Sequence, residues 1–338
     1  MSRSRKNEIY GRTVSWSTRS DISPLRYPGG KRKLAPFIAD LMERSRLAPD
    51  LFVEPFAGGA AVAISLLECG RVRSIGLADA DPLVAGFWQV VFSDQATVFA
   101  DMVSSAEVTL EEWKRIKLSE PALGLETAYK CLFLNRTSFS GALMAHTGPI
   151  GGMSQQGAYK IDCRFNRSQL AARILELSHL RNRIAFVRCE SYSDTIQHVR
   201  DNHGDTSVLW YLDPPFFAKA DRLYRHSFKN SDHEALAAAV ESMPGNWILS
   251  YDDHPDARRM YAGHPGFARI NLQYSARIDD ASRLVASEVV VSDLIASLRA
   301  AGEIQEAGIV IQLFRRRKPG AITVLQDIAV EPKMRQQA

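Results

Sequence analysis

The chain has 338 residues, 46% of them hydrophobic, which is enough for one large domain or for a domain that carries an insertion. No apolar stretch reaches the ~20 residues of a membrane span, and the first residues lack the apolar core of a secretory signal, so we expect a cytoplasmic protein without a membrane partner. The formal charge is a modest +4, and the four cysteines stand apart from one another and from histidines, so neither a zinc site nor a disulfide framework is indicated.

The predicted elements follow a polar, basic and aperiodic segment, residues 1–23, which we interpret as a flexible arm. Strands and helices then alternate from Leu51 onward, as in a βαβ unit. The alternation stops at residues 109–183, where helical segments flank a turn-rich loop at 147–157, and it resumes afterwards. This order predicts an α/β fold with one inserted domain.

The expected strands lie at 51–54, 74–78, 184–187, 208–212 and 247–250, and near 268–274, 287–292 and 308–314. The expected helices include one near 60–69, one from Pro82 with Asp81 as its cap, and one from Ser231, where Ser231 and Glu234 form a capping pattern. We assign residues 24–108 and 184–318 to the main domain, residues 109–183 to a mostly helical insertion, and residues 319–338 to a frayed tail.

The tetrapeptide Asp213-Pro214-Pro215-Phe216 directly follows the apolar run at 208–212. Two prolines cannot continue the hydrogen-bond ladder of a strand, so the chain must turn at the strand's carboxyl end, where open α/β sheets bind their ligands. Asp213 and the Pro214 carbonyl can accept the two hydrogens of a planar amine while Phe216 stacks on the attached ring, as an aminopurine would require. An exit turn with a capping aspartate is the plainer interpretation when the motif is taken alone.

A glycine-rich turn, residues 54–62, follows the first strand and lets a ligand approach the backbone closely. The turn departs from the dinucleotide-binding spacing and has no phosphate-loop lysine, which disfavours a diphosphate. Asp79, at the end of the second strand, is placed to reach two ribose hydroxyls. Lys31 follows another glycine turn and is a candidate partner for a ligand carboxylate, although a lone lysine is usually only solvated.

Six segments, taken in order over residues 24–295, resemble the adenine-specific DNA methyltransferases of the Dam type. They are Leu25-Arg26-Tyr27-Pro28-Gly29-Gly30-Lys31, residues 52–60, Leu77-Ala78-Asp79, Phe133-Leu134-Asn135-Arg136, Ser191-Tyr192 and residues 211–216. The resemblance implies a Rossmann-like methyltransferase sheet with helices on both faces, an inserted, mostly helical target-recognition domain, and a bacterial or phage origin. It also implies S-adenosyl-L-methionine as the methyl donor, with no metal, and double-stranded DNA with a flipped adenine as the partner.

The same resemblance implies that Tyr27, Lys31, Asp79 and Asp213 contact the cofactor and that Asp213 and Phe216 also serve the target adenine. We extend the site to the neighbouring motif residues. The added cofactor-binding residues are Gly30, Glu54, Pro55, Phe56 and Gly58, and the added catalytic residues are Pro214 and Pro215. Phe216 stands where the family more often has Tyr, which keeps the stacking, and Met144 stands where Dam has a basic residue, so we do not expect the recognition sequence to be inherited.

The basic residues gather in two segments. Residues 1–33 carry a net +7 and residues 130–190 a net +6, which leaves the remaining chain acidic and favours a nucleic-acid partner over ordinary solvated surface. We expect residues ~130–165 to read the DNA. The expected DNA-binding residues are Asn135, Arg136, Phe139, Lys160, Arg164 and Arg167, with Phe139 as a wedge beside the flipped base unless it and Phe133 are simply core.

Other reactions remain as alternatives. Methylation of cytosine, RNA adenine or a protein glutamine is one class, although Asp213 departs from the Ser-Pro-Pro-Tyr and Asn-containing motifs usual for cytosine and glutamine. A catalytically silent DNA-binding relative is the other class, but this chain has lost none of its cofactor or Asp-Pro-Pro residues. No obligatory protein partner is inferred.

Overall fold

The structure is a computed structural model that describes residues 5–9, 12–16, 22–26, 30–217, 228–273 and 285–304. Seven of the described strands form one sheet in the order β5-β4-β3-β6-β7-β9-β8. These strands are β3 (Leu51–Glu54), β4 (Ser74–Asp79), β5 (Ile184–Cys189), β6 (Val208–Leu212), β7 (Asn246–Asp252), β8 (Phe267–Gln273) and β9 (Val285–Ser292). Neighbouring strands from β5 to β7 are parallel, whereas β9 runs antiparallel between β7 and β8.

The strand order reverses between β3 and β6, because the chain builds β4 and β5 to one side of β3 and β6 and β7 to the other. A reversal of this kind opens a crevice at the carboxyl ends of the two central strands. Glu54 ends β3 and Asp213 directly follows β6, so the two sequence motifs meet at this crevice. The expected Rossmann-like sheet is confirmed.

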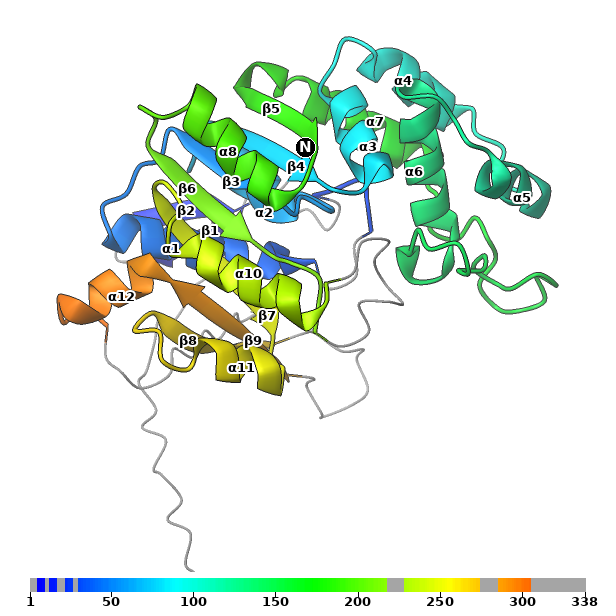
Figure 1. Cartoon of the computed structure of the whole chain (residues 1–338). Coiled ribbons are helices and arrows are strands. Elements are labelled where there is room, and N and C mark those ends of the chain that lie inside the picture. The colour runs from blue at the N-terminus through cyan, green and yellow to red at the C-terminus, as the bar shows by residue number, and fades with distance from the viewer. Residues whose placement is uncertain are drawn as a thin grey trace, which may run out of the picture.

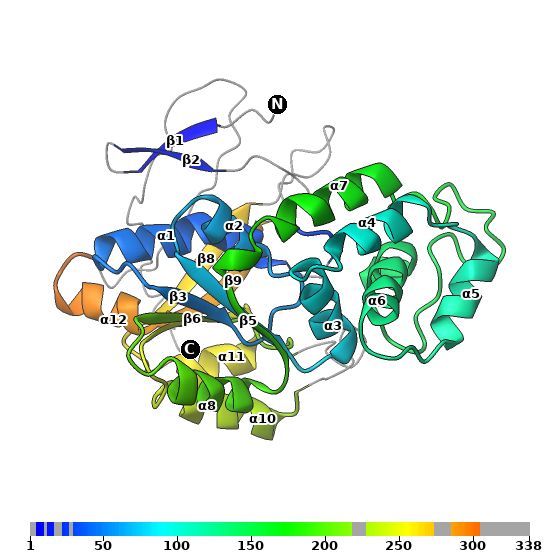
Figure 2. The same ribbon diagram turned by 90° about the horizontal axis from the view of Figure 1, so that it is seen from above.

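Alternating side chains divide each central strand between two cores, since successive residues of a strand point to opposite faces. Leu51 and Val53 of β3 face one core, whereas Phe52 faces the other. The first core is covered by α8 (Tyr192–Asn202), α10 (Asn230–Val240) and α11 (Pro255–Tyr261). The second is covered by α1 (Ala35–Arg44), α2 (Ala61–Glu68), α3 (Pro82–Val91) and α12 (Asp293–Ala300). Figure 2 shows the sheet between these two helical layers.

A second group of helices lies beside the sheet, on the right in Figure 1. It contains α4 (Ala96–Ser104), α5 (Leu110–Leu118), α6 (Leu125–Thr137) and α7 (Arg167–Ser178). Helix α3 packs against α6, and a Cβ added at Gly86 of α3 would lie 2.9 Å from the Thr127 side chain, so glycine permits this close approach. Helix α4 packs against α7. Our predicted domain boundary at 108/109 therefore divides helices that pack together. Helical periodicity in the sequence does not show which other helices a helix packs against.

Two expectations require correction. Residues 1–23 were interpreted as a flexible, aperiodic arm without strands, but β1 (Arg5–Ile9) and β2 (Arg12–Trp16) pair there as an antiparallel ribbon. The stretch 12–16 alternates polar residues with Val14 and Trp16, a pattern that favours a strand. Helix α10 starts at Asn230 rather than after a Ser231 cap, and Asp232 accepts the Lys229 N–H instead.

Other boundaries are as expected. Helix α2 starts at Ala61, and Asp81 caps α3 by accepting the Leu83 N–H at 2.9 Å. The strand expected near 308–314 and the tail at 319–338 lie outside the described residues. No helix in the described ranges has the length and apolarity needed to cross a membrane.

Candidate active site

Asp213 occupies the carboxyl end of β6, at the central crevice, and its orientation is fixed by the neighbouring strand. Ser250 of β7 donates a hydrogen bond to Asp213 Oδ1 at 3.1 Å, and the Ser250 and Tyr211 hydroxyls lie 2.8 Å apart. Burial raises the pKa of Asp213 to about 6, while the positive charge of Lys31 and the Ser250 hydrogen bond oppose that rise. Asp213 is therefore a carboxylate held ionised at neutral pH by two partners.

Lys31 is buried, with 4% of its surface exposed, and it belongs to the short 3-10 helix Lys31–Leu34. Its Nζ lies 2.5 Å from Glu288 Oε2 and 3.8 Å from Asp213 Oδ1, and it stands 5.1 Å from the centre of the Phe216 ring. The lysine is thus not a solvated surface residue. It joins Glu288, Asp213 and Phe216 into one cluster.

Glu288 belongs to this cluster but was not predicted from its position in the sequence. It lies on β9 opposite Asp252 of β7, 5% exposed, and burial raises its pKa to about 7 against the opposing charge of Lys31. The signal was present in the sequence, because Glu288 is the acid of a strand that is otherwise without charge, and three valines follow it directly. Buried acids of this kind need a charged partner.

The glycine-rich turn after β3 adopts a strained, close-fitting conformation. Gly58 and Ala60 have φ values of 45° and 47°, and the Trp88 indole N–H donates to the Gly58 carbonyl at 2.8 Å. Glu54 accepts the Ala63 N–H at 2.7 Å, which ties the end of β3 to the start of α2. Burial raises the pKa of Glu54 to about 8, although the Ala63 hydrogen bond opposes the rise.

Asp79, at the end of β4, accepts the Gly58 N–H at 2.8 Å and the Asp81 N–H at 2.9 Å. Burial raises its pKa to about 7 against these two hydrogen bonds. The carboxylate therefore fixes the glycine turn through these two hydrogen bonds. Each of its oxygens keeps a further lone pair that can accept from another donor.

These elements enclose a pocket of about 190 Å³. The expected site residues that line it are Gly30, Lys31, Glu54, Phe56, Gly58 and Asp213. The rest of the lining comes from three parts of the chain: Ile22, Ser23 and Leu25 before the first helix, Arg32 in it, and the turn and helix start at Ala57 and Gly59–Val62, together with Tyr211. Asp79 lies one hydrogen bond behind Gly58, and Phe216 reaches the site through Lys31. Pro55, Pro214 and Pro215 are outside the lining, and Tyr27 lies outside the described residues.

Asn135 requires a correction, because it is 1% exposed and fully used inside the protein. Its side-chain amide accepts the Arg26 N–H at 2.6 Å and donates to the carbonyls of Arg26 at 2.8 Å and Gly141 at 2.9 Å. Asn135 therefore holds the backbone beside the pocket and is unavailable to DNA. Its neighbour Arg136 donates through Nε to the Pro24 carbonyl at 2.5 Å, which fixes the same segment.

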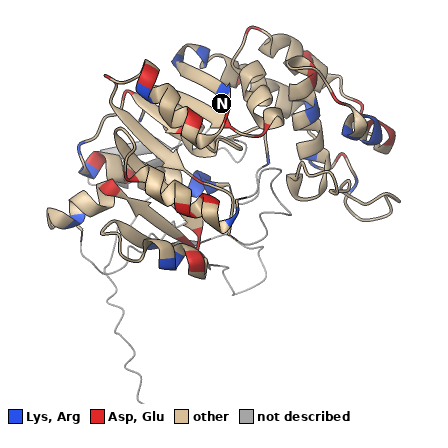
Figure 3. Ribbon diagram, viewed as in Figure 1, with Lys and Arg blue, Asp and Glu red and all other residues tan. Residues whose placement is uncertain are grey.

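The remaining candidates for DNA contact are on the surface. Phe139 is 70% exposed whereas Phe133 is fully buried, so the two phenylalanines separate into a surface and a core residue. Arg164, Arg167 and Lys160 are exposed, with Arg167 Nε donating to the Ala106 carbonyl and Lys160 to the Gln155 carbonyl. Figure 3 shows Lys and Arg on α5 and α6 of this helical region, with acidic residues also on α5.

Comparison with known proteins identifies the family. Two solved structures of the rRNA methyltransferase aviRa from Streptomyces viridochromogenes, at 2.4 Å and 1.5 Å, are similar at 14% identity; the matches cover 82% of this chain and 89% and 90% of theirs, with TM-scores of 0.35 and 0.33. No curated protein matches. Residues 27–277 match the family described as D12 class N6 adenine-specific DNA methyltransferase. The chain therefore belongs to this family, and it is an enzyme that methylates adenine in DNA with S-adenosylmethionine as the methyl donor.

Proposed function

We propose that the protein methylates the exocyclic amine of an adenine flipped out of double-stranded DNA, and that Asp213, the Pro214 carbonyl and Phe216 receive that adenine. The observation that carries this proposal is the restraint on Asp213, which Ser250 and Lys31 hold at the mouth of the β3–β6 crevice. A carboxylate acts on an amine only when its lone pairs are aimed, and these two contacts aim it.

The amine of adenine is a poor nucleophile because its lone pair is delocalised into the ring. Hydrogen bonds from the amine to Asp213 and the Pro214 carbonyl favour a tetrahedral nitrogen and localise that pair. When bound, the cofactor supplies a methyl group whose bond to sulfur breaks, leaving its electron pair on sulfur, as the bond to nitrogen forms. In this proposal Asp213, whose pKa burial raises to about 6, also accepts the proton that the nitrogen then loses.

The donor set of the pocket suits this cofactor. Glu54 and Asp213 are the acids of the lining for its cationic groups, and Glu54 would release its proton on binding. Asp79, one hydrogen bond behind Gly58, is the acid for its ribose hydroxyls, and the turn at Gly58 allows close backbone approach. Gly30, Pro55 and Phe56 shape the wall in this proposal, and Tyr27 belongs to the same motif. For Lys31 we retain the proposed contact with the cofactor carboxylate, in competition with its ion pair to Glu288.

We further propose that the helical region at 109–183 reads the target sequence. Its exposed Phe139 suits a wedge, and Arg136, Lys160, Arg164 and Arg167 supply positive charge. Flipping a base costs a few kcal/mol, and stacking on an aromatic ring such as Phe216 returns roughly 1–3 kcal/mol.

Single-molecule sequencing of DNA from bacteria that express the protein tests the proposal. We expect N6-methylated adenines in one fixed sequence context with the wild-type protein and none with Asp213→Ala. Modified cytosines, or an unmodified genome despite folded protein, would contradict it.

A further inference from the structure

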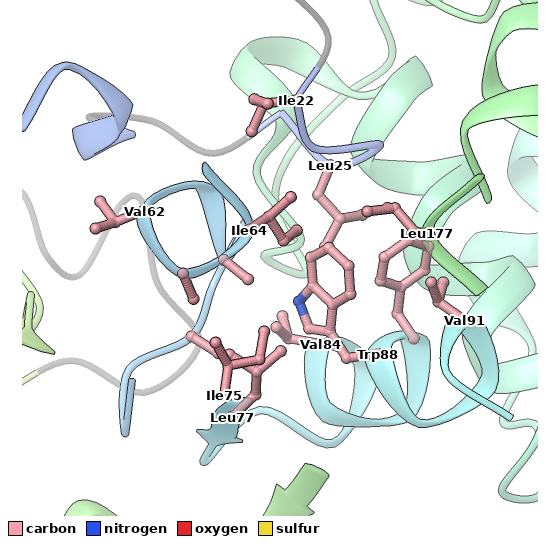
Figure 4. Close-up of a cluster of buried hydrophobic side chains, with 14 of the residues drawn as sticks. Ile22, Leu25, Val62, Ile64, Ile75, Leu77, Val84, Trp88, Val91 and Leu177 are labelled. Atoms are coloured by element: carbon pink, nitrogen blue, oxygen red, sulfur yellow. The ribbon is translucent and has the colours of Figure 1, made fainter. Parts of the chain in front are cut away.

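A second cavity, of about 550 Å³, lies against the segment 22–26 on the side of α7. Ser23 and Leu25 line both this cavity and the cofactor pocket, so the two are neighbours separated by a single stretch of chain. Leu25 is anchored in the buried cluster that contains Ile64, Trp88 and Leu177 (Figure 4). The partition between the two cavities is therefore a fixed part of the fold.

The lining of this second cavity is basic. It contains four arginines and no carboxylate; its residues are Ser23, Pro24, Leu25, Arg26, Arg136, Cys163, Arg164, Asn166, Gln169, Leu170 and Arg173. Arg173 is already neutralised, because it lies 2.7 Å from Glu68 and 3.2 Å from Glu176. The charge facing the cavity therefore comes from Arg26, Arg136 and Arg164.

Arg26 is the informative member. Asn135 holds its backbone on both sides, so the side chain cannot move away from the cavity by a shift of the chain. Its Nη1 atom is buried and makes no hydrogen bond within the described part of the chain. Burial and the nearby charge of Arg164 lower the pKa of the Arg26 guanidinium. A buried donor without an acceptor is unfavourable, and so is a like charge beside it; an anion would relieve both.

The amino end of α7 adds to this field. Asn166 caps that helix and lines the cavity, and the first turn of a helix favours negative charge. Arginine in pairs is suited to a phosphate because each guanidinium presents a planar fork of donors. The family's substrate, DNA, carries one such anion at every nucleotide.

We propose that this arginine pocket, formed by Arg26, Arg136 and Arg164, holds one backbone phosphodiester of the DNA close to the flipped adenosine. The proposal rests on the proposed function, because the adenine pocket fixes where the strand must pass. Holding a phosphate one chain segment away from the reaction pocket would set the position of the extruded nucleotide without reading its base.

The test is a binding measurement with Arg26→Gln, Arg26→Lys and a matched control, Arg73→Gln. Arg73 is an exposed arginine at the opposite, amino-terminal edge of the sheet, with its side chain 85% exposed. Fluorescence anisotropy with duplexes of the methylated context, in the presence of S-adenosylhomocysteine, gives the affinity as a function of salt. We expect Arg26→Gln to weaken binding about tenfold and to reduce the slope of log K against log salt by about 0.9, with smaller loss for Arg26→Lys and none for Arg73→Gln.

A scan of neutral methylphosphonates along the strand identifies the phosphate. At one position near the target adenine, the methylphosphonate should weaken wild-type binding as much as the Arg26→Gln substitution does. At that same position it should not weaken binding by the Arg26→Gln variant any further. Additive losses at every position, or an unchanged affinity and salt slope in Arg26→Gln, would overturn the proposal. Competition by inorganic phosphate at constant ionic strength, with no coupled position in the scan, would assign the pocket to a free ion instead.

Two controls separate this inference from the proposed function. The unfolding midpoint of Arg26→Gln should match the wild type, because its packing hydrogen bonds come from the backbone. If the wild type methylates adenine while Arg26→Gln binds DNA normally, only the phosphate pocket fails. If the wild type methylates no adenine, the proposed function fails whatever Arg26 does.

Discussion

The carboxyl edge of the sheet and the helical region beside it differ in the exposure of the charged side chains proposed to act there. At the sheet edge Lys31, Glu54 and Glu288 are buried, and their hydrogen bonds and ion pairs fix them within the site. In the helical region Arg164 and Lys160 are exposed, and a large aromatic side chain, Phe139, also faces solvent. Chemistry needs groups whose positions are set before the substrate arrives, whereas recognition of a duplex needs groups that the duplex can reach.

The largest expected effect comes from breaking the catalytic side of this comparison. Asp213→Ala should lower turnover by about 10²–10³-fold or more, because it removes the acceptor that we propose localises the amine's lone pair. Methyl transfer to duplex DNA is measured at saturating cofactor, and circular dichroism confirms folding. Asp201→Ala, which changes an exposed acid on α8, is the matched control and should leave turnover unchanged. Normal turnover by a folded Asp213→Ala protein would remove Asp213 from the mechanism.

A pair of phenylalanines on either side of the α6 terminus tests the recognition side. Phe133→Ala should lower the free energy of unfolding by about 3–5 kcal/mol, since it empties a fully buried site. Phe139→Ala should leave stability almost unchanged and weaken methylation of duplex DNA, with about 1–3 kcal/mol lost if the ring stacks beside the flipped base. Urea titration and steady-state kinetics separate the two effects. If Phe139→Ala lost stability as Phe133→Ala does, or methylated duplex DNA as the wild type does, Phe139 would have no role in DNA binding.

The sequence indicated the carboxyl edge of the sheet more directly than the residues that support it. Asp213 and the glycine turn are read from local patterns, because prolines and glycines dictate the backbone around them. Glu288 and Ser250 were not singled out, since their contacts cross 257 residues to Lys31 and 37 residues to Asp213 and depend on strand order and register. Asn135 was assigned to DNA because a motif shows residue type and not the direction in which a buried side chain points.

The missed residues sharpen the description of how Asp213 stays ionised. Lys31→Met and Ser250→Ala each remove an interaction that lowers the pKa of Asp213, and the charge of Lys31 has the larger effect. The acid limb of kcat/KM against pH, near pH 6 in the wild type if Asp213 controls it, should therefore move to higher pH in both variants. We expect a shift of about one unit in Lys31→Met and less in Ser250→Ala. Limbs at unchanged pH would show that another group controls the profile.

A pH-dependent effect concerns Glu54, whose proton links the pocket at the end of β3 to the stability of the fold. Burial raises its pKa from the ordinary value near 4.5 to about 8, so the folded protein binds a proton between these pH values that the unfolded chain releases. Its contribution to stability is fully present below pH 4.5 and is lost as the pH rises toward 8, at a rate of at most about 1.4 kcal/mol per pH unit. Asp79 and Glu288, whose pKa values are raised to about 7, also make stability fall with pH, but their contributions are lost by about pH 7.

Glu54→Gln keeps an oxygen for the Ala63 N–H and removes the titration, so it isolates this contribution. Urea unfolding from pH 5 to pH 8.5 should show wild-type stability falling with pH, and Glu54→Gln should flatten the part of the curve above pH 7, where Asp79 and Glu288 have mostly ionised. Glu234→Gln, at an exposed position of α10, is the control and should follow the wild type. Wild-type stability that rises with pH across this window, or identical slopes for the wild type and Glu54→Gln, would mean that Glu54 is ionised in the folded protein. If Glu54 is protonated in the folded protein, a cationic cofactor should displace its proton on binding. Cofactor affinity should then increase from pH 6 to pH 8 in the wild type and stay level in Glu54→Gln.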